Sequence, residues 1–172
     1  MGLADLVERT FPELDEIKNE DLRNKVVEVY VKAMMDGGWD SFDGIPFTKV
    51  IKTDITYVTH VRTVTKLAIR SAKTLDELGG IKINMDFLVA GGLLHDVGKL
   101  FEYSEIQKHE KLVRHPFSGA GLAMACDMPP EVVHIIAMHA KEGDLGKRIP
   151  EAVIVHHCDF IHFETVKALT GQ

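Results

Sequence analysis

The sequence has no apolar run of the about 20 residues that a membrane-spanning helix needs. Its first residues, MGLADLVERTF, are acidic and lack both the basic region and the cleavage site of a secretory signal peptide. Cysteine is scarce: Cys126 and Cys158 are the two present, and they form no C-x-x-C pair. We therefore expect a reduced, cytoplasmic protein that has no membrane partner.

An excess of positive charge is also missing. Lys and Arg total 20 against 26 Asp and Glu, which gives a formal net charge of −6. A protein that coats nucleic acid needs a basic face, so this balance argues against generic nucleic-acid binding. The 172 residues, 45% of them hydrophobic, suffice for one globular domain with a sizeable core. We expect a single domain spanning 1–172.

Helical patterns run along nearly the whole chain, whereas strand patterns are negligible. The ends of the expected helices are marked by capping residues, Gly-Gly pairs and prolines. The helices are 19–38, 54–78, 85–97, 116–126, 130–140 and 150–169. Two intervening stretches, 37–53 and 98–114, are expected to be the loops that set specificity. The sequence predicts an all-α helical bundle, with 1–49 as a helical extension packed on the remainder.

Histidine is frequent, with nine residues, and several histidines and aspartates occupy inward-facing helical positions. Asp159 shares a helical face with Val155 and Phe163, so its carboxylate must be paired, protonated or bound to a metal. Each position alone has an ordinary explanation as a buried polar residue. Together, inward side chains on facing helices are typical of metal sites in bundles. The candidate ligands are His60, His95, Asp96, His115, His139 and Asp159.

His95 and Asp96 lie side by side in the stretch GGLLHDVGKL. Adjacent residues diverge by about 100° around a helix, so both reach one ion only at the helix edge, or Asp96 bridges two ions. Gly91 and Gly92 lie one turn earlier and leave space for another helix or a ligand. His156 and His162 flank Asp159 by three residues, so one of them is placed to support a ligand.

The ordered set resembles the HD-domain superfamily, which is named after its adjacent His-Asp pair. The minimal family pattern corresponds to His60, His95, Asp96 and Asp159, and the resemblance covers about residues 50–165. His115 and His139 extend the match to dinuclear members, in which the Asp of the pair bridges two metals. The resemblance implies a helical bundle with a metal site in its core, and metal-dependent phosphohydrolysis as the commonest activity.

The sequence HDVGK is similar to hydrolase members of that superfamily in which the lysine lies at the substrate phosphate. The resemblance therefore implies catalytic roles for Asp96 and Lys99. Arg114 and Lys141, near two of the candidate ligands, are expected to bind phosphate or an acidic group, although ordinary solvent exposure explains them equally well. The chain lacks a G-Y-P motif, and Ala140 follows His139 where cyclic-dinucleotide phosphodiesterases have a second histidine. This argues against that subgroup and leaves the second metal one protein ligand short.

We therefore expect a phosphohydrolase that acts on a nucleotide or another small phosphate ester through a metal-activated water. Its cofactors would be two divalent transition metals, Fe, Mn, Co, Ni or Zn, with Mg as an alternative. The same six ligands would also serve a mixed-valence di-iron oxygenase that cleaves a C–C or C–P bond, and Lys99 favours hydrolysis. A non-catalytic sensing module is a third reading. The sequence leaves open whether the protein forms a homo-oligomer.

Overall fold

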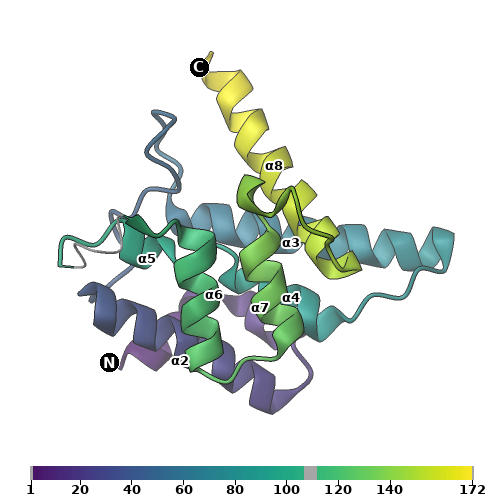
Figure 1. The fold of residues 1–172 in the computed structure, drawn as a ribbon, viewed down its shortest axis with the longest axis horizontal. Helices are drawn as coiled ribbons and strands as arrows, with labels where there is room; N and C mark the ends of the chain where they lie inside the picture. The colour runs from purple at the N-terminus through teal and green to yellow at the C-terminus, as the bar shows by residue number, and fades with distance from the viewer. Residues whose placement is uncertain (1, 107–111, 172) are drawn as a thin grey trace.

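The computed structural model describes residues 2–106 and 112–171, and the regular elements within them are all helical (Figure 1). This confirms the predicted all-α class. The elements are, in chain order, α1 (Leu3–Thr10), η1 (Pro12–Glu16), α2 (Glu20–Gly37), α3 (Tyr57–Gly79), α4 (Met85–Leu94), α5 (Lys99–Glu102), α6 (His115–Ala125), α7 (Pro130–Met138), η3 (Lys141–Gly143) and α8 (Pro150–Thr170).

Local capping decides where the helices begin and end. The α3 helix starts at Tyr57, later than predicted, because the Thr56 side chain caps it by accepting a hydrogen bond from the Thr59 N–H. The α4 helix ends at Leu94, earlier than predicted, and a turn over 95–98 leads into α5. The four-residue α5 lies in a stretch predicted to be a loop. Helix α1 has no counterpart among the bounded helices of the sequence prediction.

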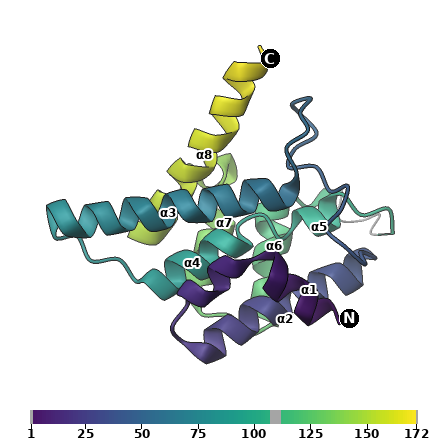
Figure 2. The ribbon, with the colours of Figure 1, turned by 180° about the vertical axis from the view of Figure 1, so that it is seen from behind.

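Helix α4 lies in the middle of the bundle, where it packs against η1, α2, α3, α7 and α8. Every residue from Leu88 to Leu94 is buried. Figure 2 shows α3 crossing the body of the protein and the C-terminal half of α8 projecting away from it. Because α4 is enclosed on all sides, the residues that follow it, His95 and Asp96, lie in the interior.

The amino-terminal helices share the main hydrophobic core with the rest of the chain. Phe11 and Tyr30 belong to the same cluster of buried side chains as Leu93 of α4 and Ile136 of α7. The Tyr30 hydroxyl donates a hydrogen bond to the Leu93 carbonyl at 2.5 Å. In the described part of the chain, no helix is both long and apolar enough to cross a membrane.

Glycines near the end of α4 allow close contact between helices. A Cβ atom on Gly91 would lie 2.6 Å from Ile135 of α7, and one on Gly92 would lie 3.1 Å from the Thr65 hydroxyl of α3. A Cβ atom on Gly98 would collide with the His115 carbonyl at the start of α6. Neighbouring helices, not a ligand, therefore occupy the space beside these glycines.

Replacing Gly98 by alanine is expected to destabilise the fold by about 1–3 kcal/mol, because overpacking against the His115 backbone forces α6 to shift. Urea unfolding followed by circular dichroism measures this change. Gly121→Ala is the matched control, since a Cβ there meets nothing within 4 Å. It should stabilise the helix by about 0.5–1 kcal/mol. Equal stabilities of the two variants would rule out the close contact at Gly98.

Candidate metal centre

Six side chains from three helices and two turns meet in the interior around the Asp96 carboxylate. His60 lies within α3, Asp159 lies within α8, and His115 is the first residue of α6. His95 and Asp96 directly follow α4, and His139 directly follows α7. The side chain of Asp159 is 16% exposed, and the other five residues are buried. The structure thus brings together all six residues that the sequence analysis selected.

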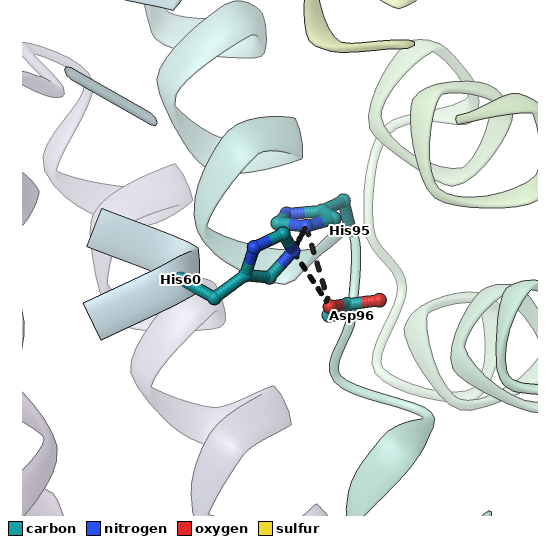
Figure 3. A group of neighbouring side chains, drawn as sticks. All are labelled: His60, His95 and Asp96. Carbon is teal, nitrogen blue, oxygen red and sulfur yellow. Dashed lines mark hydrogen bonds and ion pairs between the residues drawn. The ribbon is translucent and has the colours of Figure 1, made fainter. Parts of the chain in front are cut away.

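The two oxygens of Asp96 face different histidines. Oδ2 lies 3.1 Å from His60 Nε2 and 3.5 Å from His95 Nε2 (Figure 3). Oδ1 lies 3.2 Å from His115 Nε2 and 3.5 Å from His139 Nε2. Each oxygen with its two nitrogens forms a trio of ligand atoms that lie within 4.8 Å of one another. This is the arrangement expected of a carboxylate that bridges two cations.

Asp159 lies on the side of the first trio. Its Oδ1 is 3.1 Å from His60 Nε2. The Nε2 atoms of His60 and His95 are themselves only 3.2 Å apart. Two imidazole nitrogens so close together are stable only with a proton or a cation near them. The donor set of imidazoles and carboxylates is one that divalent transition metals prefer.

All four histidines point Nε2 inward, and each is held at its outer nitrogen, Nδ1. The rings of His95 and His139 donate to carbonyls three residues earlier, Gly92 O at 2.6 Å and Ile136 O at 2.7 Å. The other two use side chains: His60 Nδ1 lies 2.8 Å from His162 Nδ1, and His115 Nδ1 lies 2.9 Å from Glu102 Oε2. Such contacts fix ring orientation in metal-binding histidines.

One inward nitrogen is left without a hydrogen bond. Within the described residues, His139 Nε2 is buried and has no hydrogen-bond partner. Buried polar atoms rarely stay unsatisfied, because losing water without a replacement partner costs about 1–3 kcal/mol. A cation beside Asp96 Oδ1 would satisfy this nitrogen, so the residues present fit a metal.

Electrostatics keep the carboxylates ionised. Burial alone would raise the pKa of Asp96, but the charge of Lys99 and the neighbouring histidines hold it well below its usual value. Burial would also raise the pKa of Asp159, but the hydrogen bond from His60 lowers it, and the net pKa is below its usual value. Burial lowers the pKa of His95 to about 3, so this ring is neutral near pH 7. Ionised carboxylates and neutral imidazole are the forms that bind metals.

Metal affinity is expected to fall as the pH is lowered from about 8 to about 6. Burial alone would lower the pKa values of His60 and His115, but hydrogen bonds to carboxylates raise both. His60 bonds to Asp159 and Asp96. His115 bonds to Asp96 and Glu102. A metal must therefore displace protons that both rings retain above the ordinary imidazole pKa. Calorimetric Mn²⁺ titrations in two buffers of different ionisation enthalpy measure the protons released, and a pH-independent affinity would contradict this expectation.

A cavity of about 550 Å³ opens onto Asp96, His115 and Asp159. Its size suits a small organic ligand. The walls combine positive charge with aromatic rings, from Lys99, Arg114, Lys141, Phe47, Tyr103, Phe160 and Phe163. Both predicted specificity stretches reach this cavity, through 47–50 and through residues between 99 and 114. Positions 107–111 of the second stretch lie outside the described residues.

The three predicted substrate-binding residues differ in the contacts that they make with other protein groups. The ammonium group of Lys99 donates to Asp96 Oδ2 at 2.6 Å and to the Phe47 carbonyl at 2.7 Å. Arg114 Nε lies 3.6 Å from a carboxylate oxygen of Glu102 and 3.6 Å from one of Glu142. Lys141 is exposed and lines the cavity. Their contacts with a phosphate stay predictions.

His162 and His156 differ from Glu102 in how visible they are in the sequence. His162, three residues after Asp159, contacts His60, whereas His156 donates to the backbone carbonyl of His139 at 2.6 Å. That spacing was a usable signal. Glu102 had none, because α5 is too short to show a periodic pattern.

Known proteins match this chain in both family and activity class. A family model described as HD domain matches residues 57–164. A dihydroneopterin 2',3'-cyclic phosphate phosphodiesterase from Methanocaldococcus jannaschii is 34% identical over 173 aligned positions, which cover 89% of this chain and 67% of the relative. No solved structure matches the chain significantly.

Proposed function

The chain belongs to the HD domain family, and from that premise we propose that it hydrolyses a small cyclic phosphodiester with two divalent metal ions bound at Asp96. The family and the phosphodiesterase relative make it a metal-dependent phosphohydrolase and count against the oxygenase alternative. The observation that carries the proposal is one buried carboxylate shared by two trios of ligand atoms at the floor of a cavity.

The first metal would be held by His60, His95, Asp96 Oδ2 and Asp159. The second would be held by Asp96 Oδ1, His115 and His139, which leaves room there for substrate or water. Candidate ions are Fe, Mn, Co, Ni and Zn, with Mg as an alternative. When bound, such a pair supplies a water of lowered pKa and neutralises charge on the phosphate oxygens.

The protein's own groups would bind and orient the substrate. Lys99 presents a fixed positive charge beside Asp96, where a phosphate at the cavity floor would lie. Arg114 and Lys141 add positive charge to the walls, which attracts an anionic substrate. Phe47, Phe160 and Phe163 offer apolar surface to the organic group and reduce the access of water. A flat heterocycle attached to a cyclic phosphate, as in the substrate that names the relative, would place its phosphate at the charged groups and its ring at the aromatic ones.

The proposed reaction adds water to phosphorus and breaks one of the two ester P–O bonds of the ring. The product is a phosphomonoester with a free neighbouring hydroxyl. The test is a substrate panel for protein stripped of metal and reloaded with single metals. We expect rapid opening of dihydroneopterin 2',3'-cyclic phosphate or of 2',3'-cyclic nucleotides, and slow turnover of simple monoesters. Failure to hydrolyse any phosphate ester with any metal would refute the proposal.

We further propose that residues 1–172 form one domain, in which 1–49 pack on the segment matched by the family. The shared cluster of Phe11, Tyr30, Leu93 and Ile136 supports this. A cytoplasmic setting suits the two cysteines, Cys126 and Cys158, which are free and buried. Light scattering after size exclusion will determine whether the protein is a homo-oligomer.

A further inference from the structure

Glu102 is the one carboxylate that holds an inward histidine of the described site from behind. Its Oε2 lies 2.9 Å from His115 Nδ1 and also accepts the backbone N–H of His115 at 3.1 Å. A single oxygen therefore fixes both the ring and the main chain of one residue. Glu102 is 23% exposed at its side chain, and it ends α5, six residues after Asp96.

The start of α6 depends on this contact. The N-cap residue, Arg114, provides no side-chain hydrogen bond to the helix, and Pro116 has no N–H. The His115 N–H would consequently lack an intrahelical partner. Glu102 supplies the acceptor from a different helix, and its negative charge is favourable at a helix N-terminus. The first turn of α6, which carries His115, is thereby tied to the segment that follows Asp96.

Arg114 holds Glu102 from the other side. Its Nε lies 3.6 Å from Glu102 Oε1 and 3.6 Å from Glu142 Oε1, so it links α5, α6 and η3. With Oε1 facing Arg114, the other oxygen stays directed at His115. The hydrogen bond to His115 lowers the pKa of Glu102, which keeps it ionised. Arg114, expected from the sequence to contact substrate, contributes here to the wall of the site.

We propose that Glu102 is a positioning residue that controls occupancy of the second metal position, formed by Asp96, His115 and His139. It does so by keeping His115 Nε2 directed at Asp96 Oδ1. This inference rests on the two-metal function proposed above. His60, in the first metal position, is held by the His162 ring instead. Removing Glu102 should therefore weaken one position and spare the other.

The test compares the wild-type protein, residues 1–172, with Glu102→Ala, Glu102→Asp and Glu102→Gln. Metal-free samples are titrated with Mn²⁺ by calorimetry, and bound metal is counted by mass spectrometry after dialysis. We expect two ions per wild-type chain and, in Glu102→Ala, an affinity about 10–100-fold weaker for one ion only, the usual cost of removing such a partner. Glu102→Asp keeps the charge but has a shorter side chain, so it should lose affinity for the same ion as Glu102→Ala does.

Two further variants separate positioning from a general loss of structure. Glu102→Gln should recover most of the affinity, because its amide oxygen still accepts both His115 hydrogens. Glu105→Ala removes an exposed carboxylate from the same segment and should match the wild type. A purely structural role would lower the melting temperature of metal-free protein without changing the ratio of the two affinities. If Glu102→Ala does not fold, Glu102→Asp gives the same comparison.

The outcomes distinguish the inference from the function beneath it. If Glu102→Ala (or Glu102→Asp) binds both ions as tightly as the wild type does, Glu102 does not position the second metal. The two-metal function still holds in that case. If the wild type binds one ion or none, the proposed two-metal function fails, and the inference fails with it. Selective loss of one ion supports both.

Discussion

Asp96→Asn is expected to lower kcat by about 10³-fold or more, because bound metals supply several kcal/mol of transition-state stabilisation and each 1.4 kcal/mol is tenfold in rate. Both Asp96 oxygens face histidine nitrogens, so both metal positions depend on this one side chain. Asparagine is uncharged, and its NH₂ group would direct hydrogens at one of the two trios. Metal binding at that trio would be lost, and binding at the other would weaken.

Steady-state assays with a saturating metal, together with metal counts, measure this effect. Asp21→Asn is the matched control, since Asp21 is 79% exposed in the first turn of α2. It should keep wild-type activity and metal content. Circular dichroism confirms that Asp96→Asn is folded. A folded Asp96→Asn protein with more than about a tenth of the wild-type kcat would show that catalysis does not depend on the Asp96 carboxylate.

The second large effect is expected at Lys99. Lys99→Met should reduce kcat by about 10²–10³-fold, the usual loss when one fixed group that stabilises transition-state charge is removed. Methionine is of similar length but carries no charge, so it removes the positive group 2.6 Å from Asp96 Oδ2. The metal content should stay at the wild-type level, because lysine is not among the proposed ligands.

Two measurements distinguish a phosphate-binding role of Lys99 from a role in holding Asp96. Loss of kcat with full metal content supports the former. Loss of metal, with activity restored by excess metal, would show instead that Lys99 keeps Asp96 in place. Lys141→Met is the companion variant, because Lys141 is exposed at the cavity. Removing its charge should mainly raise KM, by a few fold, through weaker attraction of the anionic substrate.

The candidate ligands could be found from sequence because each occupies a recognisable helical context. Asp159 shares a face with apolar neighbours, and His95 and Asp96 directly follow an apolar run that forms the buried α4. Burial of charged or titratable groups needs a chemical reason, and that reason is visible in the pattern. The order of the six residues along the chain then indicated the family.

Contacts across the fold could not be predicted in the same way. The Phe47 carbonyl that binds Lys99 comes from a segment 52 residues earlier, and no local pattern reports such a pairing. Glu102 belongs to a four-residue helix that carries no periodic signal. Its role depends on the position of His115, which only the packing of α5 against α6 defines. The candidate ligands can thus be predicted from the sequence, whereas the residues that position them cannot.

The most direct test of a two-metal site at Asp96 is an anomalous difference map from crystals of the Mn²⁺-loaded protein. The predicted result is two peaks per chain, about 3.5–4 Å apart, on either side of the Asp96 carboxylate. One should lie among His60, His95 and Asp159, and the other between His115 and His139. A single peak, or peaks away from Asp96, would contradict the two-metal site.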